Sequence, residues 1–109
     1  MLPVQDFQIL GRRLRELGLT SPREYYGSKH WRLVASKNKR KRAECTICDI
    51  KKPLELHHLT YSRLGCEGAP DLVWTCRDCY ELIHAYANEH KMSIHNATNS
   101  IRAKWKSVS

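Results

Sequence analysis

The chain has 109 residues, with 19 Lys and Arg against 11 Asp and Glu, a formal net charge of +8 and an isoelectric point near 9.5. This length predicts one small domain, residues 1–109, which buries only roughly 60 to 65% of its unfolded surface and gains from a bound metal. No run approaches the ~18 apolar residues of a membrane span, and the N-terminus lacks the order of a secretory signal, so we expect a cytoplasmic protein.

The first part of the chain, residues 1–43, is predicted to be helical and basic. In residues 21–26, SPREYY, Ser21 and Pro22 suit the N-cap and N1 positions of a short helical turn. Ser28 suits the N-cap of a further helix that carries Trp31 and Val34 inward. An earlier amphipathic helix is indicated over residues 4–17, where apolar side chains recur at spacings of three and four: Phe7, Leu10, Leu14 and Leu17.

A basic run follows in residues 29–42, KHWRLVASKNKRKR, which carry seven basic residues and no acid. We interpret it, together with the C-terminal run RAKWK, as a surface that contacts a nucleic-acid backbone. The alternative is a solvated helix face that only adds solubility. The predicted phosphate contacts in these runs are Arg32, Lys37, Lys39, Arg40, Lys41, Arg42, Arg102 and Lys104.

Two C-x2-C pairs, CTIC at residues 45–48 and CRDC at residues 76–79, are the strongest signal in the sequence. In a reducing compartment such pairs indicate metal binding rather than disulfides. Each pair brings two thiolates to one side of a turn, and two turns complete a tetrahedral site of the structural Zn²⁺ type. The predicted ligands are Cys45, Cys48, Cys76 and Cys79. The alternative, four unrelated buried cysteines, does not explain the repeated spacing.

Between the two pairs, the sequence predicts two short strands joined by a loop. Residues 54–59 favour the first strand, residues 71–76 favour the second, and the Gly and Pro content of residues 60–70 indicates a compact loop. His57 and His58 are adjacent on a strand and point to opposite faces, so they serve different purposes. One can hold a metal while the other acts as a base, or both can be structural. A final helix is predicted from about residue 93 to residue 106.

The order of these features resembles the HNH nuclease family. One subgroup has the pattern HH-x-x-Y, a G-x-E loop, DL, and C-x-x-C-H-x-x-I-H, and this chain reads HHLTY, GCE, DLVWTC and CRDCYELIH over roughly residues 25 to 88. The resemblance implies a small α+β fold: a ββα-metal core over residues 44–90, held by the four-cysteine zinc site. Basic helices flank it in residues 1–43, and a C-terminal helix in residues 91–109.

The resemblance also implies a catalytic site. His58 matches the general base, His57 and His84 match ligands of a catalytic divalent cation such as Mg²⁺, Mn²⁺, Ni²⁺ or Zn²⁺, and Asp71 matches the residue that braces the loop. Tyr80 stands where the family has a further histidine ligand. A phenol with an ordinary pKa near 10 is a poor ligand at neutral pH, so Tyr80 either replaces a ligand or only packs.

The expected function is therefore metal-dependent hydrolysis of DNA phosphodiester bonds, weakened by Tyr80, with double-stranded DNA as partner. Arg63, in the loop, is expected to contact a phosphate near the scissile bond. Two alternatives stay open at this point. One is an inactive zinc module of the same fold that binds DNA or a protein partner, and the other is a small zinc adaptor whose basic surface binds an acidic protein.

Overall fold

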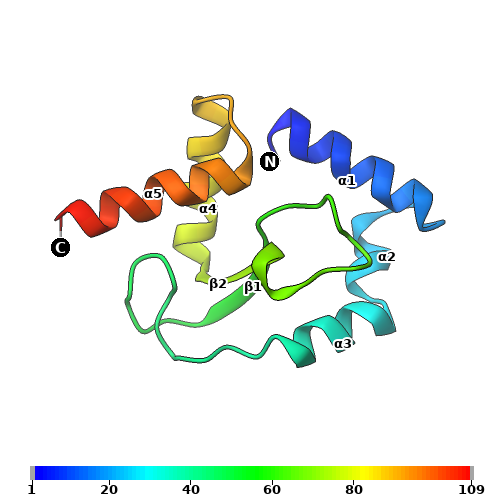
Figure 1. Ribbon diagram of the computed structural model, residues 1–109, viewed down its shortest axis with the longest axis horizontal. Helices are drawn as coiled ribbons and strands as arrows, with labels where there is room; N and C mark the ends of the chain where they lie inside the picture. Colours follow the sequence, from blue (N-terminus) through cyan, green and yellow to red (C-terminus); the bar gives the residue numbers. More distant parts are fainter. Residues whose placement is uncertain (1, 109) are drawn as a thin grey trace.

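Figure 1 presents the computed structural model, which describes residues 2–108, with side chains as far as residue 105. Five α-helices, a short 3-10 helix and a two-stranded sheet make up this part of the chain, so the α+β class is confirmed. The elements in chain order are α1 (Val4–Glu16), α2 (Pro22–Tyr26), α3 (Lys29–Lys37), β1 (Leu54–His58), η1 (Ala69–Asp71), β2 (Leu72–Cys76), α4 (Arg77–Glu89) and α5 (Ile94–Val108).

Helix α1 forms where the apolar spacing predicts it, but its buried stripe is narrower than expected. Leu10 and Leu14 are buried, whereas Phe7 is 66% exposed. The expectation that Phe7 faces the core is wrong, because the helix packs against the rest of the chain over only part of its surface. Arg13 Nε donates to the carbonyl oxygen of Leu64 at 3.1 Å, which ties α1 to the loop between the strands.

Helices α2 and α3 begin at the predicted N-caps. The Ser21 hydroxyl accepts a hydrogen bond from the Glu24 amide, and the Ser28 hydroxyl accepts one from the Trp31 amide at 3.2 Å. Each bond satisfies an amide that would lack a partner in the first turn. These local signals depend only on neighbouring residues, which is why the sequence locates both helix starts.

The two strands form an antiparallel hairpin that sets the positions of the site residues. His57 lies opposite Val73 and His58 opposite Leu72 in the register. Because side chains alternate along a strand, Glu55 and His57 point to one face of the sheet. The other face carries Leu54, Leu56 and His58 of β1 and Trp74 of β2. The prediction that His57 and His58 face opposite ways follows directly from this alternation.

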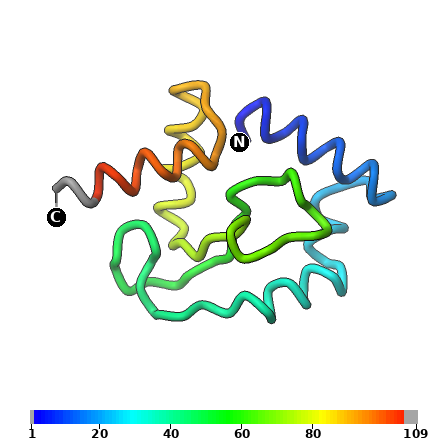
Figure 2. The backbone as a smooth tube through the Cα atoms, in the orientation of Figure 1, coloured from blue at the N-terminus to red at the C-terminus, as the bar shows by residue number. Residues whose placement is uncertain are grey.

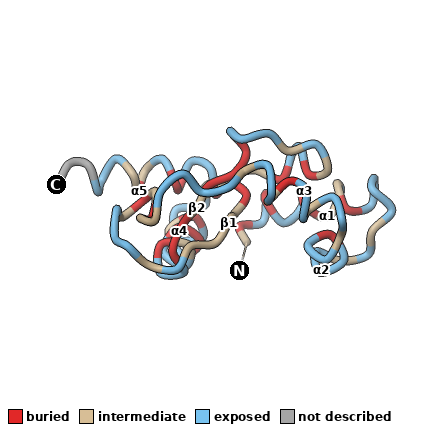
Figure 3. The backbone as a smooth tube through the Cα atoms, turned by 90° about the horizontal axis from the view of Figure 1, so that it is seen from below, coloured by how far each residue is buried: buried red, intermediate tan, exposed pale blue. Residues whose placement is uncertain are grey.

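Helix α4 starts where β2 ends, and α5 crosses it and packs against it (Figures 1 and 2). The N-terminal residues of the chain lie beside the turn between these two helices. There the buried carboxylate of Asp6 accepts a hydrogen bond from the Ile94 amide at 3.1 Å, so α1 caps the start of α5. Figure 3 shows that buried residues concentrate in the strands and along α4, between the flanking helices.

None of the described helices combines the length and apolar character needed to cross a membrane.

Candidate functional site

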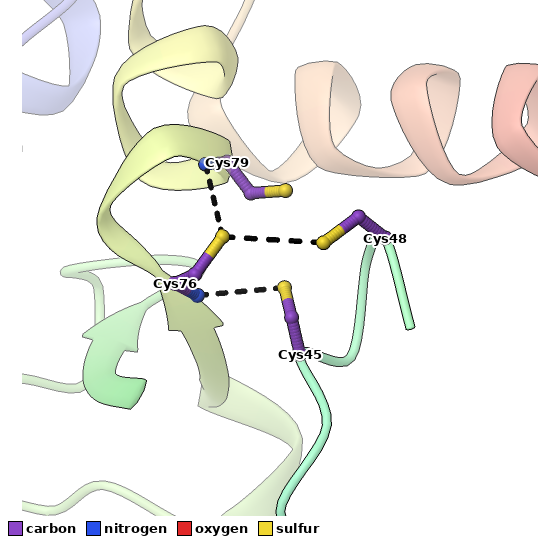
Figure 4. Close-up of side chains that lie close together, drawn as sticks. All are labelled: Cys45, Cys48, Cys76 and Cys79. Carbon is purple, nitrogen blue, oxygen red and sulfur yellow. Dashed lines mark hydrogen bonds between the residues drawn. The ribbon is translucent and has the colours of Figure 1, made fainter. Parts of the chain in front are cut away.

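The four cysteines of the C-x2-C pairs converge on one point (Figure 4). Their sulfur atoms all lie within 4.8 Å of one another, and the Sγ atoms of Cys48 and Cys76 are 4.0 Å apart. Cys45 and Cys48 come from a turn that precedes β1, in which Asp49 adopts a left-handed φ of 61°. Cys76 ends β2 and is the N-cap of α4, and Cys79 lies in the first turn of that helix.

Hydrogen bonds and burial suit these sulfurs to a bound cation. The amides of Ile47 and Cys76 each donate to Cys45 Sγ at 3.4 Å. Burial acts to raise the pKa of Cys45, but backbone amides outweigh it and hold the pKa at about 7. Burial and neighbouring sulfurs raise the pKa of Cys79. Four thiolates at these distances repel one another unless a cation lies between them, so the donor set and its spacing fit a structural Zn²⁺.

A second cluster lies on the face of the sheet that carries His57. The rings of His57 and Tyr80 stack at a centroid distance of 3.9 Å, and those of Tyr80 and His84 lie 4.1 Å apart. Helix α4 therefore brings Tyr80 and His84 to the face of β1 that carries His57, as their spacing of four residues predicts. The Tyr80 ring contacts both imidazoles, and burial raises the pKa of its hydroxyl, so the phenol stays protonated at neutral pH.

Two buried atoms in this cluster have no hydrogen-bond partner: Glu55 Oε1 and His57 Nε2. They are 3.5 Å apart, which is within the distance of an ion pair but outside good hydrogen-bond geometry. Adjacent ligands of one small divalent cation lie about 3 to 3.5 Å apart, as follows from metal–ligand distances of about 2.1 Å. Burial lowers the pKa of His57 to about 4, which keeps its imidazole neutral and able to donate a lone pair. The pair fits two ligands of a cation.

His84 does not complete a three-ligand group with this pair. Within the described residues, the four cysteines are the one set of three or more His, Cys, Asp or Glu ligand atoms that all lie within 4.8 Å of one another. A cation at Glu55 and His57 would therefore take its other ligands from water or phosphate, or from a shift of His84. Glu55 is therefore the nearest potential co-ligand of His57 in this structure, and the prediction that His57 and His84 hold one cation stays a prediction.

Arg77 supplies positive charge at the edge of this cluster. Its guanidinium donates to Glu55 Oε2 at 2.8 Å and lies 5.0 Å from the centre of the Tyr80 ring. Together with Tyr80, Glu81 and His84, Arg77 lines a cavity of about 330 Å³. The cluster thus combines a buried nitrogen and oxygen that lack hydrogen-bond partners with an adjacent guanidinium.

His58 occupies a very different environment on the other face. The residue is 3% exposed, and its side chain has no exposed surface. Its Nε2 lies 2.7 Å from Glu67 Oε2 and its Nδ1 lies 3.2 Å from the Tyr26 hydroxyl. Its ring stacks with both Trp31 and Tyr61 at centroid distances of 5.1 Å. Since both nitrogens are engaged and no solvent reaches them, His58 cannot act as general base unless α2, α3 or the loop moves away.

Glu67, from the G-x-E loop, is the centre of the network around His58. Its side chain is fully buried. It accepts hydrogen bonds from the Tyr25 hydroxyl and from the Gly65 amide, the latter at 3.0 Å, and its Oε1 lies 3.2 Å from His30 Nε2. Burial acts to raise the pKa of Glu67, but hydrogen bonds from His58 and Tyr25 outweigh it and lower the pKa to about 2. The loop, β1 and the two short helices are therefore joined through one ionised carboxylate.

Asp71 and Arg63 also act within the loop. The Asp71 carboxylate accepts bonds from Arg63 Nε and from the Gly68 amide, both at 2.9 Å, and its carbonyl accepts from the Leu59 amide at 2.7 Å. Asp71 thus joins Leu59, Arg63 and Gly68 within the loop. Arg63 makes an ion pair with Asp71 rather than standing free for a phosphate. The phosphate contact of Arg63 stays a prediction, since its side chain is 61% exposed in this pair.

The basic run lies against the opposite face of the sheet from His57 and Tyr80. The Trp74 indole donates to the carbonyl oxygen of Asn38 at 2.7 Å, which fixes the segment after α3 across that face. Arg42 pairs with Asp49, and Lys104 lies 4.5 Å from the centre of the Tyr86 ring. Several of the predicted cations surround a cavity of about 490 Å³ on this side: Lys37, Lys39, Arg40, Lys41, Arg42 and Arg102.

The sequence analysis assigned no role to three residues that make central contacts in the structure: Glu55, Glu67 and Arg77. Glu55 had a usable signal, because residues two apart on a strand share a face and Glu55 lies two residues before His57. Glu67 is part of the G-x-E motif, although nothing local indicates its contact with His58. Arg77 reaches Glu55 only through the hairpin, so its position depends on the tertiary fold.

Comparison of the chain with protein-family models, with curated proteins and with solved structures gives no significant match.

Proposed function

We propose that the protein is a divalent-cation-dependent hydrolase of DNA phosphodiester bonds, built around a structural zinc site. The observation that carries the proposal is the pair of buried, unpartnered atoms, Glu55 Oε1 and His57 Nε2, 3.5 Å apart. A buried polar atom without a hydrogen-bond partner costs about 1–3 kcal/mol, so a pair of them points to a missing ligand. The resemblance of the HHLTY and CRDCYELIH segments to HNH nucleases supports the same chemistry.

The residues of the cluster have distinct roles in this proposal. Glu55 and His57 hold the cation, which supplies an activated water and stabilises negative charge on the phosphate. Arg77, at the rim of the cavity, neutralises the phosphate and orients Glu55 through its 2.8 Å hydrogen bond. Tyr80 projects from α4 onto β1 and keeps His57 in place by stacking. With only two protein ligands, we expect weak cation binding, so activity requires a high ion concentration.

His58 is a positioning residue in this proposal. Its bonds to Glu67 and Tyr26 fix the end of β1, and His57 is the preceding residue of the same strand. Substitution of His58 would therefore affect the cation site indirectly, by loosening the strand that carries His57. A direct role in proton transfer would require its burial to be lifted when DNA binds.

A second candidate function is a zinc-containing DNA-binding module without hydrolytic activity. Two observations favour it: the ring of Tyr80 lies where the resembling family has an imidazole ligand, and the histidine expected to be the base is buried. In this alternative, the cations around Lys39 and Arg40 bind the phosphate backbone, and the Glu55–His57 contact is only a weak ionic pair.

Nicking of supercoiled plasmid separates the two functions. Zinc-loaded protein would be incubated with plasmid and increasing Mg²⁺, Mn²⁺, Ni²⁺ or Zn²⁺, in parallel with Glu55→Gln, His57→Ala and, as an exposed control, His95→Ala. We expect nicking that depends on the added ion, that is lost in the first two variants and that persists in the control. Ion-independent nicking, or equal rates in all four proteins, would refute the hydrolase. Plasmid binding without nicking in any ion would favour the binding module.

A further inference from the structure

The face of the sheet opposite His57 carries a groove with an apolar floor and a cationic rim, which we call the basic groove. It comprises two neighbouring cavities of about 490 and 400 Å³ that share Lys39, Arg40 and Trp74. Apolar side chains from the strands line them, namely Leu54, Leu56 and Leu72 with Trp74. The remaining cations of the rim are Lys37, Lys41, Arg42 and Arg102, and the one acidic residue lining it is Glu44.

The rim carries positive charge that the protein itself does not neutralise. Arg42 pairs with Asp49, but the side chains of Lys37, Lys39, Arg40 and Lys41 make no ion pair or hydrogen bond with any residue that the structure describes. These four side chains are exposed. Clustered cations of this kind repel one another and destabilise the free protein, so they favour an anionic partner with regularly spaced charges.

The floor discriminates between two forms of such a partner. A duplex presents phosphates on its outside and keeps its bases stacked inside, so it meets the cationic rim but leaves an apolar floor unused. An unpaired strand can place phosphates on the rim and turn a base onto an aromatic side chain. Trp74 is half-buried and lines both cavities, and its hydrogen bond to Asn38 holds the indole in a fixed orientation.

We infer that the basic groove binds single-stranded DNA, with phosphates on Lys39 and Arg40 and one base stacked on Trp74. The choice of DNA over RNA rests on the proposed function, whereas the stacking and charge arguments do not. The groove lies on the other face of the hairpin from Glu55 and His57. It therefore offers a place for an unpaired strand while a second segment of DNA occupies the hydrolytic face.

Fluorescence anisotropy with dye-labelled 12-nucleotide probes tests the inference without any added catalytic cation. The probes are oligo-dT, the same length of abasic deoxyribose phosphate, oligo-rU and a duplex of the same length. The proteins are the wild type, Trp74→Leu, Trp74→Phe and, as a control for loss of an indole outside the groove, Trp105→Leu. Zinc content and circular dichroism establish that each variant is folded.

We expect the wild type to bind oligo-dT roughly 5- to 150-fold more tightly than the abasic probe, the range associated with stacking of one base on an aromatic ring. Trp74→Leu should remove most of this difference while leaving abasic binding unchanged. Trp74→Phe, which keeps a ring but loses the indole donor, should retain most of it. Trp105→Leu should behave as the wild type.

Several results would overturn the inference. Equal binding of oligo-dT and the abasic probe by the wild type would exclude base stacking. An equal loss of oligo-dT affinity in Trp74→Leu and Trp74→Phe would show that Trp74 only holds the segment after α3 in place. Duplex binding tighter than oligo-dT binding would assign the groove to double-stranded DNA, and tighter oligo-rU binding would assign it to RNA. Glu55→Gln should bind oligo-dT normally even if no nicking is ever observed. A failure of the hydrolase proposal can therefore be distinguished from a failure of the proposal that the basic groove binds single-stranded DNA.

Discussion

Replacing His58 with alanine tests whether this histidine is a structural centre or a catalytic base. In the structure its side chain has no exposed surface, both nitrogens are engaged, and its ring stacks with Trp31 and Tyr61. Alanine would leave a cavity between the two rings and remove one partner from the buried carboxylate of Glu67. A residue that only transferred protons at a surface site would leave folding nearly unchanged.

The size of the effect follows from the contacts that are lost. Truncation of a large buried ring to alanine costs about 3–5 kcal/mol. Loss of a hydrogen bond to a charged group costs about 1.5–3 kcal/mol, and the two terms overlap because neighbouring groups relax together. Glu67 keeps its bonds from Tyr25 and Gly65, which limits the second term. We therefore expect His58→Ala to lower the free energy of unfolding by about 3 to 5 kcal/mol.

Urea unfolding at pH 7 with excess zinc measures this change, and thermal unfolding should show a decrease of roughly 12 to 20 °C, at roughly 4 °C per kcal/mol for a domain of this size. His95→Ala, at an exposed position of α5, is the matched control and should change stability by less than about 0.5 kcal/mol. A loss of less than about 1 kcal/mol in His58→Ala would refute the structural role and return His58 to consideration as a base.

Four further predictions concern the metal sites and the charged surface. Wild-type protein should contain one tightly bound zinc, and Cys48→Ser should lose both the zinc and the cooperative unfolding transition, as metal analysis and circular dichroism would show. Tyr80→His should tighten Mn²⁺ binding by about tenfold, or about 1.4 kcal/mol, in calorimetric titrations, because it places a third imidazole beside His57; an unchanged affinity would place the cation elsewhere. The nitrogen-15 chemical shifts of the His57 ring should stay constant from pH 7.5 to 5.5. Burial holds the pKa of His57 at about 4, so the neutral form that binds a cation persists above that pH. A titration midpoint near pH 6.5 would contradict the burial of His57. Neutralising Lys39, Arg40 and Lys41 of the basic groove should reduce the slope of log binding constant against log salt concentration by up to about three units. An unchanged slope would show that these three side chains face solvent and contact no phosphate.

Much of the fold is predictable because its signals are local. The N-caps at Ser21 and Ser28 depend on amides three residues away. The spacing of the four cysteines predicts that they form one metal site, and the structure brings their sulfur atoms together. Alternation along β1 predicts that His57 and His58 face opposite ways. The exposure of Phe7 was not predictable in this manner, because the apolar spacing of a helix gives its buried direction but not the extent of the surface that covers it.

The candidate site was only partly predictable, because its decisive contacts join distant segments. The sequence indicates that His57, Tyr80 and His84 share a face, and the structure places them together. It gives no sign that residues from α2, α3 and the loop enclose His58, since this enclosure depends on how three segments pack. The sequence also does not indicate which face of the sheet the basic run covers, which the Trp74 bond to Asn38 determines.

Anomalous scattering from crystals soaked in Mn²⁺ is the most direct test of the proposed hydrolytic site. Data collected above and below the manganese absorption edge would locate the ion independently of the zinc held by the four cysteines. We expect a manganese peak bound by Glu55 Oε1 and His57 Nε2, absent from crystals of Glu55→Gln. A protein that nicks DNA in Mn²⁺ while showing no manganese at this pair, or showing it only at another position, would exclude Glu55 and His57 as the ligands of the catalytic ion.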